Sequence, residues 1–329
     1  MTTVFLTGAS GFLGGHLLTE LVKAGHTVKA LSRRQESDAT ISALGGIPVR
    51  AALDDVNSLK SALAGCDAVF HAAADTSMWK PQAAIQTSTN VQGTQNLITA
   101  CESAGINAFI HTSSVSAFSH LVQDTLIEST TQLGGDSWIN YERTKYLSEQ
   151  LVRNSSLPWI VFNPANIIGP GDRHNWARLI MLIDKEKLPG IPPGMGNFAD
   201  VRAIAGAQVK AWHDQRFGQC YLAGGESLNF LDFVHQIGAA LGKKTPNGSM
   251  PVWAIMTYAK LSDAWSRISG TEPDITPESA TLTSYGHHVD SSKAQRELDY
   301  RITPIATLIA DTLAWMIAEQ MIAVKAVSR

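Results

Sequence analysis

The stretch "VFLTGASGFLGGHLL", residues 4–18, decides the fold. It begins with an apolar run, places glycines at 8, 11 and 14, and enters a second apolar run at Phe12. This order predicts a strand, a tight glycine turn and a helix. Glycines have no side chain, so a ligand can come close to the backbone at such a turn. The helix N-terminus there attracts anions through its dipole and its free N–H groups. The pattern therefore indicates a bound pyrophosphate.

Charge and cysteine content narrow the class of protein. The 329 residues include 26 basic and 29 acidic side chains, for a formal net charge of -3. The sequence shows no basic stripe that would contact a phosphate backbone, so we expect no nucleic acid partner. Cys66, Cys101 and Cys220 are far apart and form no CxxC or Cys/His cluster. This spacing favours the reducing cytoplasm, where we expect the protein to act.

Membrane, metal and hydrolase signals are weak. The apolar stretch 305–324 is interrupted by Asp311, Glu319 and Gln320, so we expect a packed terminal helix and no membrane span. The ten histidines show no HExxH pattern, and His287-His288 lies in a loop-like stretch, so no metal is expected. A GxSxG elbow, typical of hydrolases, is also missing from the sequence.

Strand and helix patterns alternate through the first half of the chain. Helices are predicted to begin near Phe12, Ser37, Val56, Asn90 and Asn140. Strands are predicted at 3–7, 27–32, 47–51, 67–73, 108–113, 159–164 and 219–224. Such alternation is typical of βαβ units, and right-handed crossovers then give a doubly wound parallel sheet. The predicted fold class is α/β of the Rossmann type, with its ligand crevice at the carboxyl ends of the strands.

The composition changes after Pro164, where "GPGD" and "LPGIPPGMGN" are rich in turn formers. Residues 1–165 are predicted to form a dinucleotide-binding domain, joined by a later strand and helix near 200–224. Residues 166–329 are predicted to form a smaller, mostly helical substrate domain laid over the crevice.

The tip of the second strand reads Leu31-Ser32-Arg33-Arg34, without an acid for the adenosine ribose. Two guanidinium groups beside a hydroxyl suit a 2'-phosphate. We therefore expect NADP(H) in preference to NAD(H). The alternative is that one arginine simply faces water.

A second group of residues is typical of carbonyl chemistry. Tyr141 and Lys145 lie four residues apart, on one face of a predicted helix, after a strand that ends at Ser113 and Ser114. Tyr141 is predicted to be the general acid in carbonyl reduction and the general base in alcohol oxidation. Lys145 and the positive cofactor ring are expected to lower the phenol pKa. Ser114 would donate a hydrogen bond to the substrate oxygen.

The motifs "TGASGFLG", "HAAA", "NVQGT", "TSS", "YERTK" and "NPANIIGPGD" occur in that order. In this order they resemble the extended short-chain dehydrogenase/reductase superfamily over nearly the whole chain. The later "SGTEPDITPES" and "VDSSKAQRELDY" resemble its dihydroflavonol reductase-like and 3β-hydroxysteroid dehydrogenase-like group. "SVSAF" and Asn163 depart from the "VYG" and Arg-Pro segments usual in the sugar-nucleotide epimerases and dehydratases.

The resemblance favours Ser114 over Ser113 and implies that Asn90 mostly braces the sheet. It also implies that Leu53 contacts the adenine, because Ala52 stands where the family usually has an acid. Residues and resemblance together predict these cofactor-binding positions: Thr7, Gly8, Ser10, Gly11, Phe12, Leu13, Gly14, Ser32, Arg33, Arg34, Leu53, Asp54, His71, Ala72, Ala73, Ala74, Asn90, Thr112, Tyr141, Lys145, Pro164, Asn166 and Ile167.

Predicted substrate contacts are Met78, Trp79, Ser114, Asn166 and Trp176. Aromatic and Met-rich walls favour an apolar or aromatic carbonyl compound. A second aromatic group is more typical of a buried core than of a pocket, because it follows helical spacing; it comprises Trp253, Met256, Tyr258, Leu261 and Trp265.

The sequence thus predicts an NADP(H)-dependent oxidoreductase that reduces a ketone or aldehyde reversibly by hydride transfer. One alternative is a sugar-nucleotide epimerase or dehydratase with tightly held NAD(P). Another is a binding protein that senses the NADP redox state, although such a sensor has no chemical use for Tyr141 and Lys145. A homodimer through the helices near residues 90 and 140 is a further expectation from the resemblance.

Overall fold

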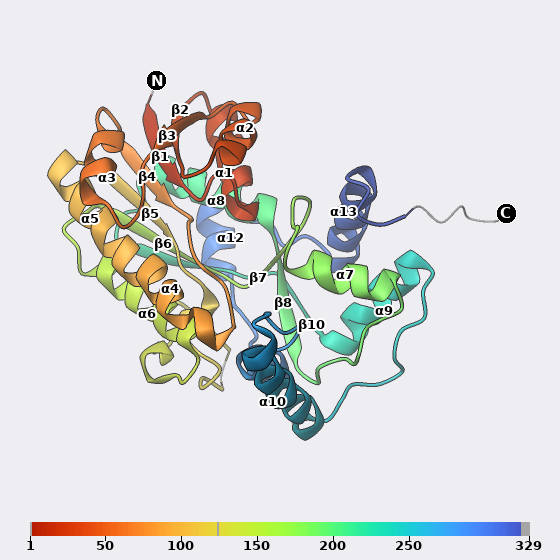
Figure 1. Ribbon diagram of the computed structural model, residues 1–329. Helices are drawn as coiled ribbons and strands as arrows, with labels where there is room; N and C mark the ends of the chain where they lie inside the picture. Colours follow the sequence, from red (N-terminus) through yellow and green to blue (C-terminus); the bar gives the residue numbers. More distant parts are fainter. Residues whose placement is uncertain (1, 124, 324–329) are drawn as a thin grey trace. The chain divides into compact units, whose positions relative to one another are not determined.

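The computed structural model describes residues 2–123 and 125–323 (Figure 1). The chain divides into two compact units. The first ends at Ala165 and is completed by Val201–Ala223 and Asp290–Arg301. The second comprises Asn166–Asp200, Gly224–Val289 and the chain from Ile302.

The first unit is built on a seven-stranded sheet of order β3-β2-β1-β4-β5-β6-β9, with every neighbouring pair parallel. The strand order reverses between β1 and β4, the position where doubly wound sheets bind their ligands. This architecture confirms the predicted Rossmann fold. The strands are β1 (Thr3–Thr7), β2 (Thr27–Ser32), β3 (Ile47–Arg50), β4 (Ala68–His71), β5 (Ala108–Thr112), β6 (Trp159–Pro164) and β9 (Gln219–Ala223).

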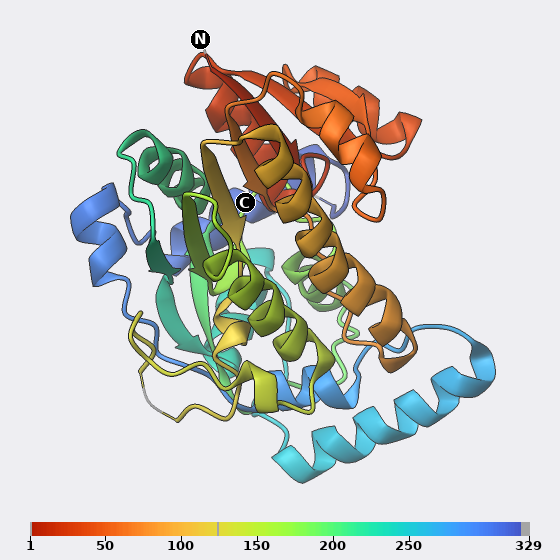
Figure 2. The same ribbon diagram turned by 90° about the vertical axis from the view of Figure 1, so that its left-hand side faces the viewer.

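Helices cover both faces of this sheet (Figures 1 and 2). On one face lie α1 (Phe12–Lys23), α2 (Gln35–Ala43), α8 (Val201–His213) and α12 (Ser292–Leu298). On the other lie α3 (Val56–Leu63), α5 (Gly93–Ala104) and α6 (Asn140–Arg153). The helix expected from Asn90 begins earlier, because α4 (Ala83–Thr87) continues through a π-helical turn into α5.

The core beneath α3, α5 and α6 is apolar on both sides of the contact. Phe5, Val69, Phe109 and Val161 come from four neighbouring strands and are fully buried there. Both faces of a doubly wound sheet are covered, so its strands are nearly continuous apolar runs. That is why the sequence predicts these strands so closely.

The second unit contains a three-stranded sheet of order β10-β8-β7, which the sequence did not predict. Its strands β7 (Asn166–Ile168), β8 (Met195–Asp200) and β10 (Glu226–Asn229) are short and contain Asn or Gly, so they lack the usual strand pattern. The helices are α7 (Trp176–Asp184), α9 (Phe230–Leu241), α10 (Val252–Ser269), α11 (Pro277–Ser284) and α13 (Ile305–Ala318).

The apolar C-terminal stretch forms α13, whose Leu308, Leu313 and Met316 pack in the core of the second unit, as expected. Val324 lies outside the described residues. Across residues 2–123 and 125–323, none of the helices combines the length and the apolar character needed to cross a bilayer.

One expectation for α10 is wrong. Trp253, Leu261 and Trp265 were expected in the core, yet they are 74%, 67% and 67% exposed. The buried face of α10 is instead made of small or polar residues with one large side chain: Ile255, Ala259, Asp263 and Ser266. Helical spacing correctly predicted that these side chains share one face of α10. It could not tell whether that face is buried or exposed.

Truncation of the core should be costly at the sheet. We expect Phe109→Ala to lower the free energy of unfolding by about 3–5 kcal/mol, since it leaves a cavity in the first unit. Ile85→Ala, at a side chain that is 56% exposed on α4, should change it by less than about 0.5 kcal/mol. Urea denaturation of both variants checks this, and equal losses would contradict the assigned core.

Candidate active site

The glycine turn between β1 and α1 has no room for side chains. Gly8 has φ +78°, and a Cβ on it would lie 2.7 Å from the amide nitrogen of Ala73. A Cβ on Gly14 would lie 1.9 Å from the carbonyl oxygen of Gly8. Gly11 begins α1 without a side-chain cap, and the first turn carries no acid. The turn therefore fits the close approach of a pyrophosphate to the first backbone amides of α1.

A buried hydrogen-bond chain connects β1, β4 and α5 beneath this turn. The hydroxyl of Thr94 donates to the carbonyl oxygen of Asn90 (2.6 Å), so it accepts from Nε2 of His71 (3.0 Å). Nδ1 of His71 then accepts from the hydroxyl of Thr7 at 2.7 Å. Burial, with a contribution from Lys145, lowers the pKa of His71 to about 3. His71 is thus a neutral positioning residue that holds β4 beside β1.

The tip of β2 carries more charge than the sequence indicated. Arg33 and Arg34 are exposed, and the hydroxyl of Ser32 donates to Asp38 at 2.6 Å. Asp38, from the first turn of α2, is also ion-paired with Arg50 at the end of β3. The strand tip therefore does have a neighbouring carboxylate, six residues after Ser32. Arg50 offsets its charge, which leaves Arg33 and Arg34 in excess.

The other predicted cofactor positions in the first unit line the same strand ends. Leu53 is partly buried and its carbonyl oxygen accepts from Nδ2 of Asn96 at 2.8 Å, while Asp54 is exposed. Ser10 is exposed, Phe12 and Leu13 begin α1, Ala72 to Ala74 follow β4 directly, and Pro164 ends β6. Asn166 and Ile167 belong to the second unit, where they begin β7.

Tyr141, Lys145 and Glu149 follow one another at four-residue intervals along α6, so they share one face of the helix. The ammonium group of Lys145 donates to the carbonyl oxygen of Thr112, at the end of β5, at 2.9 Å. Thr112 therefore contributes its backbone to the site. This bond fixes the lysine against the carboxyl end of the sheet.

The two serines after β5 have different partners. The hydroxyl of Ser113 donates to Glu149 at 2.7 Å and is buried. Ser114 shares a hydrogen bond with the hydroxyl of Tyr141 and also accepts from the backbone nitrogen of Ser116 at 3.1 Å. Of the two, only Ser114 is placed to act with the phenol.

Three influences shift the pKa of Tyr141 in the protein without its cofactor. Burial raises it above its ordinary value, the hydrogen bond from Ser114 opposes that rise, and Asp75 adds to it. The ammonium of Lys145 is directed at the Thr112 carbonyl, and it is not among the groups that shift this pKa. The expected lowering of the phenol pKa involves the bound cofactor ring together with Lys145, so it stays a prediction.

Glu149 is a functional residue that the sequence reasoning missed. It is fully buried, yet it lies four residues beyond Lys145 on the same face of α6. Burial lowers the pKa of Lys145 to about 8, and the charge of Glu149 opposes this shift. Its carboxylate accepts from four donors: Ser113 (2.7 Å), Asn163 (2.6 Å), Gln132 (2.7 Å) and Arg153 (3.5 Å).

Asn90 fastens the loop after β4 to α6. Its side chain accepts from the backbone nitrogen of Asp75 (2.7 Å), donates to the Asp75 carbonyl (2.9 Å) and donates to Thr144 (3.1 Å). The following residues, Met78 and Trp79, are half-buried. The predicted substrate loop therefore begins from a fixed point beside the Tyr141 helix.

The predicted substrate residues of the second unit have structural partners there. Trp176 is the first residue of α7. Its ring packs against Phe198 and Phe233, with ring centroids 5.2 and 5.3 Å away. Asn166 accepts from the backbone nitrogen of Asn197 at 3.1 Å. Contact of either residue with a substrate stays a prediction.

No cluster of three or more His, Cys, Asp or Glu side chains suited to a metal occurs among the described residues.

The fold and this site define a class: the chain is an NAD(P)-dependent enzyme of the short-chain dehydrogenase/reductase type. Residues 4–205 match the NAD dependent epimerase/dehydratase family, and the chain belongs to it. This confirms the resemblance seen in the sequence.

Individual relatives match at least 90% of the chain. It is 29% identical over 330 residues to sterol demethylase protein B of Methylococcus capsulatus, covering 97% of this chain and 100% of that protein. It is 32% identical over 317 residues to a 2-alkyl-3-oxoalkanoate reductase of Stenotrophomonas maltophilia, covering 90% and 94%. The crystal structure of gox2253 is similar with a TM-score of 0.83 and 28% identity, covering 98% of this chain and 100% of that one.

Removal of the Glu149 charge should shift the pH profile of the enzyme. In Glu149→Gln the pKa of Lys145 falls further below its usual range, because the opposing negative charge is gone. The ammonium is then lost at a lower pH, so the alkaline limb of kcat/KM should move to lower pH.

Glu142→Gln is the matched control, since Glu142 is a buried carboxylate on the same helix that bonds Ser119 and His120 instead. Its alkaline limb should stay in place. Equal shifts in the two variants, or no shift in Glu149→Gln, would contradict the role of Glu149. Thermal denaturation of both variants checks that they fold.

Proposed function

We propose that the chain is an NADP(H)-dependent oxidoreductase that reduces a ketone or aldehyde and oxidises the corresponding alcohol. The observation that carries this proposal is the hydrogen bond between Ser114 and Tyr141, one helical turn from the buried ammonium of Lys145. A hydroxyl pair beside a cation is suited to polarise a carbonyl oxygen and then protonate it.

Each side chain has a distinct task in this proposal. Tyr141 stays protonated in the free protein, because burial raises its pKa, and so it is ready to donate a proton to the developing alkoxide. Ser114 donates a hydrogen bond to the same oxygen. Lys145, anchored on the Thr112 carbonyl, places a positive charge near the forming oxyanion.

The glycine turn and the end of β2 would hold the cofactor. Bound there, the nicotinamide supplies the hydride that reduces the carbonyl carbon. Gly8, Gly11 and Gly14 leave room for the pyrophosphate, and Arg33 and Arg34 would bind a 2'-phosphate. Among the described residues, neither of these arginines forms an ion pair, which supports NADP(H) over NAD(H).

An apolar carbonyl compound is the substrate class that we favour. Two relatives are named 2-alkyl-3-oxoalkanoate reductase and sterol demethylase protein B, and alkyl chains and sterols are apolar. A nucleotide sugar would need free cationic groups for its diphosphate. In the described part of the second unit, however, every arginine is already ion-paired: Arg173 with Glu319, Arg178 with Asp274 and Arg267 with Asp263.

A second candidate function is that of an epimerase or dehydratase, because the family to which the chain belongs is named for these activities. It predicts cofactor that copurifies with the protein and sugar-nucleotide conversion without net consumption of NADPH.

A cytoplasmic location is also part of the proposal, supported by three free cysteines.

Loss of the phenol should abolish turnover. In Tyr141→Phe, kcat for NADPH-dependent reduction of a panel of aliphatic and aromatic ketones should fall at least about 100-fold, since the proton donor is gone. The Kd for NADPH should stay within about threefold, because the glycine turn is intact. Tyr146→Phe, five residues along the same helix, is the control and should retain activity. Full activity of Tyr141→Phe would exclude the proposed chemistry.

Cofactor choice should depend on the strand tip. The double variant Arg33→Ser/Arg34→Ser should lose about 10-fold or more of its preference for NADPH over NADH, measured as the ratio of kcat/KM values. Arg301→Ser, an exposed arginine elsewhere in the first unit, should leave the ratio unchanged. A wild-type enzyme that prefers NADH would show that the two guanidinium groups face only water.

A further inference from the structure

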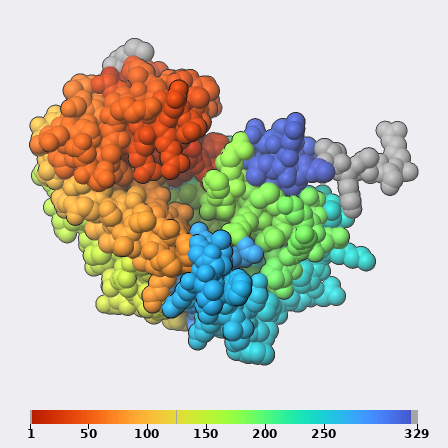
Figure 3. Space-filling model, in the orientation of Figure 1, coloured from red at the N-terminus to blue at the C-terminus, as the bar shows by residue number. Residues whose placement is uncertain are grey.

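Helix α10 presents an apolar face to solvent along its whole length. Trp253, Leu261, Trp265 and Ile268 are 67–79% exposed, and their spacing of eight, four and three residues keeps them on one side of the helix. Exposed apolar side chains are common singly, but a continuous stripe with two tryptophans indicates a binding surface. In the space-filling view the α10 region, in blue, lies at the surface of the second unit (Figure 3).

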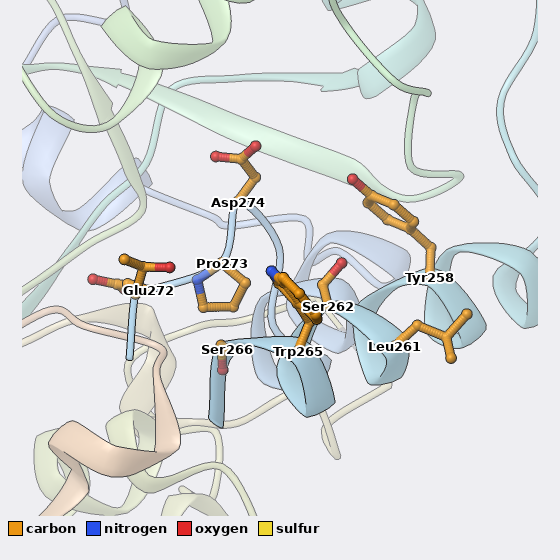
Figure 4. A pocket seen from close by; sticks show the side chains of 9 residues that line it. Tyr258, Leu261, Ser262, Trp265, Ser266, Glu272, Pro273 and Asp274 are labelled. Atoms are coloured by element: carbon orange, nitrogen blue, oxygen red, sulfur yellow. The ribbon is translucent and has the colours of Figure 1, made fainter. Parts of the chain in front are cut away.

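The apolar stripe continues into a groove beside the helix. The groove lies between Tyr258, Leu261 and Trp265 of α10 and the segment 271–274 that follows the helix. Figure 4 shows the Trp265 indole upright next to Pro273 at this groove. Its far side carries Glu272 and Asp274, and Asp274 is ion-paired with Arg178.

The charges on α10 itself are of one sign at the surface. Lys260 and Arg267 are exposed, seven residues apart, and so lie along one edge of the apolar stripe. The single acid of the helix, Asp263, is buried and bonds Nη2 of Arg267 at 2.8 Å. The outer surface of α10 therefore combines tryptophan and aliphatic side chains with two cations and no exposed carboxylate.

The size of this face argues against a second copy of the chain as its partner. Eighteen residues make a helix of about 27 Å, so one face of about 10 Å width offers roughly 270 Å². A stable protein interface buries about 800 Å² on each partner. A bilayer has no such threshold, because each apolar side chain that enters it contributes separately.

From these observations we propose that α10 docks the protein on an anionic lipid bilayer surface. Trp253, Leu261, Trp265 and Ile268 enter the boundary between headgroups and acyl chains, while Lys260 contacts anionic headgroups. Tryptophan favours this interfacial depth, and a basic amphipathic helix lies in its plane. The docking does not depend on the catalytic proposal, since α10 belongs wholly to the second unit.

Vesicle co-sedimentation of the full chain tests the proposal. The wild type should sediment with vesicles of phosphatidylcholine and phosphatidylglycerol in equal parts, and less with phosphatidylcholine alone. Leu261→Ser/Trp265→Ser should bind the mixed vesicles at least about tenfold more weakly. Ile47→Ser, at a 49% exposed side chain on β3, is the matched apolar control and should bind like the wild type.

The charge contribution is tested in the same assay. Lys260→Glu should reduce the preference for the anionic vesicles, whereas Lys60→Glu, an exposed lysine on α3, should not. Circular dichroism and Tm check that every variant folds. Absence of wild-type binding, or equal binding by Leu261→Ser/Trp265→Ser, would overturn the proposal. So would a concentration-dependent dimer that this double variant abolishes while no vesicles are bound, because a second copy would then cover the face.

Discussion

The structure depends most on one buried cation, the ammonium of Lys145. A buried charge is costly unless it is paired and hydrogen-bonded. Here the Thr112 carbonyl accepts from the ammonium, and Glu149 supplies the opposing charge one turn further along α6. Glu149 in turn binds Ser113 and Asn163. The lysine thereby couples β5, β6 and α6 into one rigid support for Tyr141.

The same logic explains the rest of the carboxyl edge of the sheet. His71 is kept neutral by burial and joins Thr7 of β1 to Thr94 of α5 by hydrogen bonds. Asn90 closes the loop after β4 onto α6. These hydrogen-bond networks hold the backbone that follows β4 and β5. This backbone lies at the same edge of the sheet as the glycine turn. Preorganisation of this kind is the usual source of catalytic power in such sites.

The sequence predicted the first unit closely and the second less well. The strands of the first unit are buried on both faces, so each is a short apolar run between turn signals, and the run Trp159–Pro164 was placed to the residue. The strand Met195–Asp200 contains glycine and asparagine and had no such signal. The face of α10 shows a related limit, since periodicity detects an apolar stripe but not what covers it.

Within the candidate site, motif spacing predicted Tyr141 and Lys145, while the charges around them came only from the structure. Asp38 lies six residues beyond Ser32, and the intervening helix turn that brings them together is not visible in a strand-tip motif. Glu149 could have been found from the sequence, because Tyr141, Lys145 and Glu149 recur at intervals of four. The burial of Glu149, which brings its charge close to Lys145 and away from solvent, could not have been predicted from the sequence.

The most direct measurement for this account is the ionisation of the Tyr141 phenol, followed by tyrosinate absorbance in wild type minus Tyr141→Phe. In the free protein the pKa should lie above its ordinary value, since burial disfavours the phenolate. On addition of NADP+ it should fall, because a cationic ring close to the phenol favours the phenolate. A phenol that ionises at its ordinary value, with no response to NADP+, would contradict a partly buried proton donor at this site.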